Sequence, residues 1–326
     1  MIPIALKPKF NASFLQHLFA LALMVLAMTL LSDKFATADN LFNVMRQISV
    51  NLCISVGMTL VILTGGIDLS VGSILAFSGA IAAGLVEWGI GITGIDAFIG
   101  FTFFGVVLAA LIAGGALGWF NGLMITRFKV PPFVATLAML TMARGFTMLY
   151  TGGFPITGLG YTFAFVGTGW WLGIPMPVWV SIGVIALFTF FMRKTKTGRY
   201  IYAVGGNEKA TRLSGVNVRR VKMVVYTLAG VLSAVAGILV TARLDSAQPN
   251  AGMGYELDSI AAVVIGGTSL NGGKGSIIGT VIGALIIGVL NNGLVLLNVS
   301  PFWQQVIKGM VILLAVIIEK AGRKKD

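Results

Sequence analysis

Asp68 is the residue of this chain whose type and setting most directly suggest chemistry. It lies in the run Gly65-Gly66-Ile67-Asp68-Leu69-Ser70-Val71-Gly72, inside a stretch from Val50 to Val86 that is otherwise largely apolar. An ionised carboxylate at membrane depth costs roughly a few kcal/mol. Glycines on both sides allow a helix to break there, which frees backbone groups to line a cavity. The segment is therefore typical of a transport path rather than of a catalytic cleft.

Two interpretations of Asp68 remain open on the sequence, and both can hold at once. In the first, the carboxylate fixes a gate or a substrate path at the helix break. In the second, Asp68 and Ser70 form a structural cap. They would accept hydrogen bonds from backbone N–H groups at the start of the helix predicted over residues 70–86.

Arg144 is a second charge inside an apolar segment, residues 132–150. Its guanidinium must pair with another group, reach the interface along its aliphatic stem, or face water. One hypothesis is a buried ion pair between Arg144 and Asp68. The candidate residues for the translocation path or its gate are Asp68, Ser70, Asn51, Arg144 and Asp258.

The chain offers no credible catalytic set. His17 is its only histidine, so a His-rich metal cluster is excluded and a His-based triad would depend on a residue in the first apolar segment. Cys53 is its only cysteine and reads as a small buried hydrophobe. We therefore expect no enzymatic activity, no metal site and no cofactor bound by this chain.

The elements that position these residues must be membrane helices. The chain has 326 residues, of which 57% are hydrophobic and only 10% charged, whereas soluble domains are near a quarter charged. We predict an all-α polytopic membrane protein with a single transmembrane domain over residues 1–326 and no nucleotide-binding domain. About ten segments are expected, at 14–31, 47–65, 70–86, 97–120, 132–150, 178–192, 223–242, 257–267, 276–297 and 302–318.

Local features refine this picture. Segment 257–267 is too short to cross a bilayer and is expected to be a re-entrant half-helix. Gly114…Gly118 and Gly279…Gly283 have the spacing that lets membrane helices pack closely. Residues 151–177, with Trp170 and Trp171, read as an extracytoplasmic loop with interfacial aromatics.

The net charge of +12 could suggest a nucleic-acid partner, but its distribution favours membrane topology. Nine of the 23 basic residues lie between Arg193 and Lys222, where Glu208 is the only acid. The other basic clusters are Lys7 and Lys9, Arg127 and Lys129, and Lys320 with Arg323, Lys324 and Lys325. By the positive-inside rule, all of them agree with an even number of spans and with both termini in the cytoplasm.

The basic loop 193–222 is the strongest functional segment outside the apolar regions. Asn207 is a plausible helix N-cap and Gly215 a plausible helix end, so a short basic amphipathic helix is predicted between them. One interpretation is a solvated loop that only sets topology. The other is a docking helix for a partner subunit on the cytoplasmic side.

The sequence also carries a weak internal repeat. The run Gly66–Ile74 resembles Gly267–Ile277, and Asn121-Gly122-Leu123 with Pro132-Phe133 resembles Asn292-Gly293-Leu294 with Pro301-Phe302. Internal repeats place substrate paths at their interface in many transporters. The span count makes the first pair parallel and the second inverted, so the orientation of the repeat stays open.

Long runs of the chain resemble the permease subunits of carbohydrate ABC importers of the ribose, xylose and galactose class. The resemblance covers about residues 40–318. It rests on Val56-Gly57-Met58-Thr59-Leu60-Val61-Ile62-Leu63 with Gly65–Ser73, on Gly198-Arg199-Tyr200-Ile201-Tyr202-Ala203 with Gly205-Gly206-Asn207-Glu208, and on Tyr255–Thr268.

This resemblance implies a function and a set of partners. The expected function is the transmembrane permease of an ATP-driven monosaccharide importer, most closely for D-ribose, in the bacterial inner membrane. The resemblance implies a permease homodimer, a cytoplasmic ATP-binding subunit that holds ATP and Mg, and a periplasmic sugar-binding protein. Its coupling loop maps onto Gly205, Asn207, Glu208, Ala210, Arg212 and Gly215.

The match to the importer coupling motif is incomplete. That motif reads Glu-Ala-Ala, three residues, then Gly, whereas here Glu208-Lys209-Ala210 precedes Gly215 by one residue more. The alternative function is a stand-alone ion-coupled secondary sugar transporter or channel, with Asp68 and Arg144 as coupling residues. Such a carrier needs neither an ATPase nor a binding protein, which separates the two functions experimentally.

Overall fold

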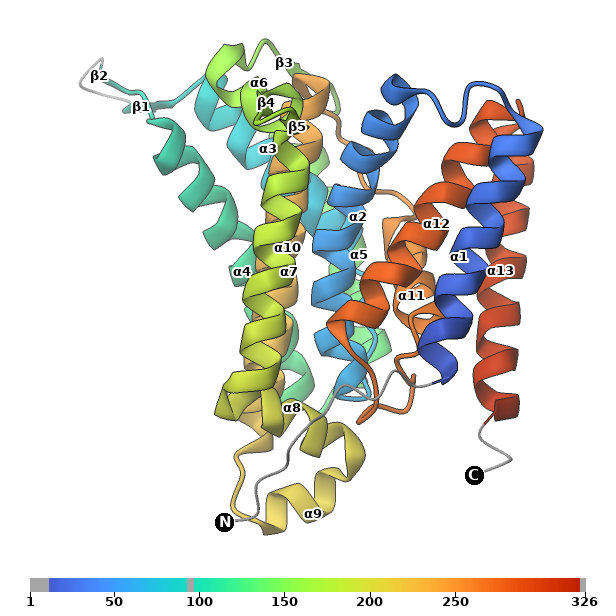
Figure 1. The fold of residues 1–326 in the computed structure, drawn as a ribbon. Helices are drawn as coiled ribbons and strands as arrows, with labels where there is room; N and C mark the ends of the chain where they lie inside the picture. Colours follow the sequence, from blue (N-terminus) through green and yellow to red (C-terminus); the bar gives the residue numbers. More distant parts are fainter. Residues whose placement is uncertain (1–11, 93–96, 323–326) are drawn as a thin grey trace.

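The computed structural model describes residues 12–92 and 97–322, which are mostly helical (Figure 1). Lys7, Lys9, Arg323, Lys324 and Lys325, which entered the topology prediction, lie outside the described residues. The helices are α1 Ala12–Leu31, α2 Ala38–Leu63, α3 Val71–Glu87, α4 Phe103–Arg127, α5 Pro132–Thr151, α6 Gly160–Thr168, α7 Met176–Lys194, α8 Lys196–Gly206, α9 Glu208–Leu213, α10 Val218–Leu244, α11 Tyr255–Ile265, α12 Ile277–Leu296 and α13 Pro301–Gly322.

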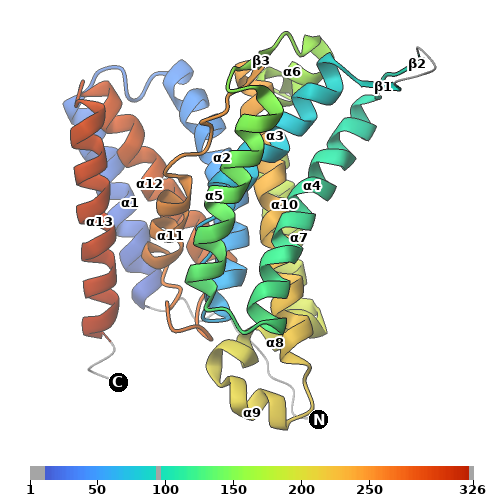
Figure 2. The same cartoon turned by 180° about the vertical axis from the view of Figure 1, so that it is seen from behind.

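In the described part of the chain, three short antiparallel strand pairs accompany the helices. They are β1 Ile90–Ile92 with β2 Ala97–Ile99, β3 Ile156–Thr157 with β6 Ser246–Ala247, and β4 Trp170–Trp171 with β5 Ile174–Pro175. All three lie at one end of the helix bundle, together with α6. Helices α8 and α9 lie at the opposite end, where α1 begins and α13 ends (Figures 1 and 2).

Each of the ten predicted segments contains a helix, but the number of membrane crossings is a separate matter. In the described part of the chain, six helices are long and apolar enough to cross a membrane: α2, α4, α5, α7, α10 and α12. Three apolar helical stretches are shorter, Leu15–Leu31, Val71–Glu87 and Pro301–Ile317. Helix α11 has only 11 residues, as its short apolar run predicted.

The largest boundary errors fall on two of the predicted segments. The segment predicted at 97–120 begins as strand β2, and its helix runs from Phe103 to Arg127, because Thr102 accepts the Gly105 amide as an N-cap. The segment predicted at 47–65 starts nine residues earlier, at Ala38. Its first turns contain polar residues that find partners inside the fold: Asn40 bonds with Asn292, and Arg46 lies 4.8 Å from the centre of the Trp170 ring.

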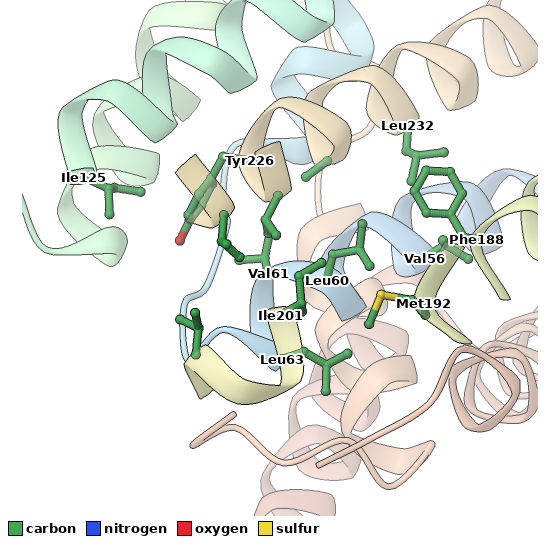
Figure 3. Packing of buried hydrophobic residues seen from close by; sticks show 14 of the residues in the cluster. Val56, Leu60, Val61, Leu63, Ile125, Phe188, Met192, Ile201, Tyr226 and Leu232 are labelled. Carbon is green, nitrogen blue, oxygen red and sulfur yellow. The ribbon is translucent and has the colours of Figure 1, made fainter. Parts of the chain in front are cut away.

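Helices α2 and α10 form the centre of the bundle. The apolar windows of α2, α12 and α10 are 89%, 83% and 67% buried, whereas those of α4, α5 and α7 are 28% buried. Leu60 and Leu63 of α2 belong to one apolar cluster with Ile201 of α8 and Tyr226 of α10 (Figure 3). The core therefore continues from the spanning helices into the short helix α8.

Glycines set the closest helix contacts, as their spacing predicted. A Cβ atom at Gly114 or Gly118 of α4 would press on the backbone of α10, at Gly230 and Tyr226. A Cβ atom at Gly279 or Gly283 of α12 would overlap carbonyl oxygens of Gly266 and Ala262. Small residues allow backbones to approach closely, and here they join α4 to α10 and α12 to α11.

The chain between α10 and α11 is not helical. Residues 248–254 form turns, with Gly252 and Gly254 at φ +72° and +81°, where L side chains are strained. This segment descends from the β6 end of the bundle to α11, which continues toward the α8 end (Figures 1 and 2). Helix α11 thus follows directly on an unwound stretch.

Candidate functional site

Asp68 lies in the loop between α2 and α3 and is fully buried. Its Oδ1 atom accepts two hydrogen bonds from Ser70, one from the backbone N–H at 2.9 Å and one from Oγ at 2.6 Å. The Ser70 Oγ in turn accepts from Nδ2 of Asn121 on α4 at 2.9 Å. A Cβ at Gly66 would overlap the Tyr226 hydroxyl of α10, so the loop is held from two sides.

The cap interpretation of Asp68 is confirmed in part. Asp68 accepts the N–H of Ser70, the residue directly before α3, but Ser70 makes no side-chain cap bond of its own. Ser70 instead donates to Asp68. Thr136 of α5 also donates to Pro132 and to the Ile67 carbonyl of the loop, at 2.9 and 3.3 Å.

We expect Asp68→Asn and Asp68→Ala to behave differently. The asparagine variant keeps an acceptor oxygen for both Ser70 donors, whereas alanine leaves two buried donors unpaired, at about 1–3 kcal/mol each. Denaturation of the purified permease in mixed micelles should therefore show a loss of stability for the alanine variant only. Full stability of Asp68→Ala would contradict the structural role. A stable Asp68→Asn variant without transport would favour the gate interpretation.

The proposed ion pair between Asp68 and Arg144 does not form. Arg144 of α5 donates from Nη1 to the backbone carbonyls of Pro249 and Ala251, at 2.6 and 2.9 Å. Those carbonyls belong to the unwound segment before α11, which has no helical partners for them. The arginine therefore supplies hydrogen-bond donors to the carbonyls of a backbone break inside the bundle. Exchanging the charges of Asp68 and Arg144 is not expected to restore the function lost when either charge alone is reversed.

The two helix breaks pack against each other. A Cβ at Gly72, in the first turn of α3, would overlap the Gly252 carbonyl and approach Oε2 of Glu256. Arg144 also interacts electrostatically with Glu256. One arginine, one glutamate and two glycines thus join the break that follows α2 to the break that precedes α11.

Asp258 of α11 forms a second buried polar centre. Its side chain is 6% exposed, and Oδ2 accepts from Nζ of Lys308 on α13 at 3.1 Å and from Nδ2 of Asn291 on α12 at 3.2 Å. Asn292, the next residue of α12, exchanges two hydrogen bonds with Asn40 of α2. These contacts connect α11, α12, α13 and α2.

Asn51 belongs to a polar stripe on α2 rather than to either charged centre. Asn51, Ser55 and Thr59 are buried and follow one another at four-residue spacing, which places them on one face of the helix. The Thr59 hydroxyl lies 2.7 Å from that of Thr280 on α12. The stripe therefore runs toward the contact between α2 and α12.

The short helix predicted between Asn207 and Gly215 is present as α9, Glu208–Leu213. Asn207 caps it by accepting the Ala210 N–H at 2.9 Å. The helix ends at Gly215, with φ +83°, through bonds from Gly215 N to Arg212 O and from Val216 N to Thr211 O. This is the pattern of a Schellman motif. Leu213 at its tip is 89% exposed, which leaves an apolar side chain free at the end of the bundle.

Helix α8, which precedes α9, was not predicted. Its last turn meets two loops: a Cβ at Gly205 would overlap the Leu63 carbonyl oxygen at the end of α2 and the Gly273 amide nitrogen. Gly273 N itself donates to Leu63 O at 3.0 Å. We call this contact of Leu63, Gly205 and Gly273 the glycine joint. Tyr202 of α8 adds a hydrogen bond to the Gly275 carbonyl at 3.0 Å.

The glycine joint also brings together the two glycine-rich halves of the proposed repeat, the loops at 64–70 and 266–276. Their polar partners differ, however. Asn121 bonds to Ser70 beside the first loop, whereas Asn292 bonds to Asn40 of α2. The two loops therefore lie close together in space, whereas the internal repeat stays a prediction.

Glu208 secures α9 to α10. Its carboxylate pairs with Lys222 at 2.7 Å and with Arg212 at 2.9 Å. The hydrogen bond from Lys222 is the largest cause that lowers the pKa of Glu208 below its ordinary value. Thr211 completes the attachment by donating to the Ala203 carbonyl of α8.

The direction of this pKa shift predicts a pH dependence. A carboxylate with a depressed pKa in the folded state stabilises fully above its unfolded pKa of about 4.3, and this stability is lost as pH falls through the folded value. The difference in thermal midpoint between the wild type and Glu208→Gln should be constant from about pH 5 to 7 and shrink below about pH 4. A difference that grows on acidification would contradict the pairing.

Several residues of these centres escaped the sequence analysis. Lys308 lies inside an apolar segment, and a lysine at that position was a usable signal for a buried partner. Asn121 and Asn291 gave the weaker signal of an amide in an apolar helix. Tyr226 and Tyr202 gave none, because tyrosine is common in such helices and only the fold shows what their hydroxyls contact.

Comparison with known proteins adds an independent line of information. Residues 40–316 match the family model described as the branched-chain amino acid transport system permease component. The chain is 52% identical to the ribose import permease protein RbsC of Escherichia coli K12 over 310 residues, which is 93% of this chain and 92% of that protein. It is 51% identical to the protein of the same name from Bacillus subtilis 168, over 92% of this chain and 90% of the relative.

A relative named for a different sugar is less similar. Identity to the D-allose transport system permease protein AlsC of Escherichia coli K12 is 39%, over 93% of this chain and 90% of that protein. No solved structure matches this chain significantly.

Proposed function

Because this chain belongs to the family of branched-chain amino acid transport system permease components, we propose that it forms the transmembrane pathway of an ATP-driven importer for D-ribose. One observation carries the choice of sugar. Identity to ribose import permeases exceeds that to the allose permease over the same extent of chain. The chain is a transport component rather than an enzyme and works with an ATPase and a binding protein.

The arrangement in the membrane follows from family and charge together. The chain is a multi-pass inner-membrane protein. We place the end with α8 and α9 in the cytoplasm, because the basic residues of segment 193–222 gather there. This orientation puts both termini in the cytoplasm. It also makes about ten crossings, with the unwound segment and α11 counted as one.

We assign the transmission of ATP-driven movement to α9, α8 and the glycine joint. A partner that binds α9 would contact Ala210, Arg212 and Leu213, which are exposed. Asn207 and Gly215 fix its ends, and Glu208 and Thr211 attach it to α10 and α8. Movement of α8 then acts on both loops through Gly205.

The gate is assigned to the two helix breaks. Asp68 and Ser70 hold the break after α2, and Arg144 holds the one before α11. Asp258 fixes the half-helix that follows, and Asn51 lies on the polar stripe of α2. Two permease copies are expected to enclose the pathway, with ATP and Mg bound by the partner ATPase.

Ribose uptake into proteoliposomes tests this function. The permease is reconstituted with its ATPase and binding protein. In separate reactions one protein or ATP is left out, or ATP is replaced by a nucleotide that cannot be hydrolysed. Uptake that requires all of them is the expected result, with allose as the matched control sugar. Uptake by this chain alone, driven by an ion gradient, would replace the importer with a secondary transporter.

A further inference from the structure

We propose that a groove on α4 and α10 binds an anionic phospholipid, with its headgroup on Arg219 and Arg220 and its acyl chain along α10. The groove has a volume of about 480 Å³. Its lining residues are Trp119, Asn217, Arg219, Arg220, Met223, Val224, Thr227 and Leu228. This site is separate from the helix breaks and does not depend on which sugar is carried.

The groove is charged at one end and mostly apolar along the rest. Arg219 and Arg220 are exposed in the first turn of α10, while Met223, Val224 and Leu228 follow in the next two turns. Among the residues that the structure describes, no acidic side chain lines it. A partner with an anionic head and a hydrocarbon tail matches this order.

The length of the groove fits one leaflet. Arg219 and Leu228 are nine residues apart, which corresponds to about 13 Å along a helix. Half of a bilayer hydrocarbon core is about 15 Å. Farther along α4, toward its first turn, exposed Phe104, Leu108 and Ile112 lie on one face, as expected where a helix meets lipid.

A second cavity continues the basic end. It has a volume of about 630 Å³, shares Asn217 and Arg219 with the groove, and is also lined by Lys129, Arg212 and Lys222. Glu208 is the only acid that lines it within residues 12–92 and 97–322. The positive charge at the headgroup position is therefore not neutralised by the residues around it, which favours an anionic over a zwitterionic lipid.

Trp119 provides a direct readout. It is 47% exposed and lines the apolar part of the groove. The full-length permease is reconstituted in phosphatidylcholine vesicles that contain a low fraction of brominated phosphatidylglycerol or brominated phosphatidylcholine. The chain has six tryptophans, so the Trp119 signal is the difference between wild type and Trp119→Phe.

We expect quenching at Trp119 to favour phosphatidylglycerol by about thirtyfold in effective concentration, the size expected for two basic groups on one headgroup. The preference should disappear in Arg219→Gln/Arg220→Gln. It should persist in Lys196→Gln/Arg199→Gln, which removes the same charge from exposed residues of α8. Equal quenching by both lipids, or an unchanged preference without the two arginines, would overturn the proposal. Absence of quenching by either lipid would also overturn it, because a protein surface would then cover the groove.

Discussion

Gly205→Ala is expected to reduce ATP-dependent ribose uptake to near background. The added Cβ would overlap the Leu63 carbonyl oxygen and the Gly273 amide nitrogen. Both are backbone atoms, so neither can rotate away as a side chain would. Overpacking of this kind costs about 1–3 kcal/mol and occasionally more. At this position it would also separate α8 from the loop after α2, which carries one helix break, and from the loop that follows α11.

Gly206→Ala is the matched control. Gly206 is the next residue, has no atom within 4 Å of an added Cβ, and does not have a positive φ. Uptake and stability should therefore stay close to wild type. Both variants should be measured for uptake, for ATPase activity of the assembled complex, and for denaturation of the permease alone.

The combination of these readouts separates structure from coupling. A Gly205→Ala variant that folds and assembles but hydrolyses ATP without uptake would support transmission through the glycine joint. Wild-type uptake by Gly205→Ala would refute that role, because the joint would then tolerate a displacement. An equal loss of uptake in both glycine variants would indicate that the effect arises from a changed helix propensity of α8 and not from the contact at Gly205.

Lys308→Met is expected to destabilise the permease by about 2–4 kcal/mol. Removal of one partner leaves the Asp258 carboxylate buried without its cation, a change that typically costs 3–5 kcal/mol in a fully buried pair. The lysine side chain is 30% exposed, so water moderates the effect. Unfolding in mixed micelles of detergent and dodecyl sulfate measures the difference.

The double variant Asp258→Asn/Lys308→Met should recover most of the lost stability. A neutral amide needs no cation and can still bond to Asn291 of α12. Lys34→Met makes the same chemical change at an exposed turn and should have little effect. Additive losses in the double variant would contradict a direct pair. Recovered stability without recovered uptake would show that transport uses these charges.

Much of the secondary structure could be predicted because it depends on local physics. A run of apolar residues must be satisfied by helical hydrogen bonds inside a bilayer, so each predicted segment contains a helix. Asn207 and Gly215 delimit α9 because caps act within a few residues of the chain. Boundaries were wrong where polar residues continue a helix, as in the first turns of α2.

The partners of buried charges could not be predicted in the same way. Arg144 and Asp68 were the two most conspicuous charges in apolar segments, yet each has other partners. Arg144 bonds to carbonyls 105 and 107 residues away. Pro249, Gly252 and Gly254 mark this segment as non-helical, but no local pattern places it inside the bundle against α5.

The sequence by itself therefore determined that this is a helical membrane protein with broken helices, a capped basic helix and the motifs of a sugar permease. The tertiary structure decided which breaks meet, which cation pairs with Asp258, and that Gly205 contacts two loops. The physical reason is the distance along the chain over which each interaction acts. Hydropathy, capping and glycine spacing act along a few turns of one helix, whereas ion pairs and backbone contacts depend on which helices become neighbours.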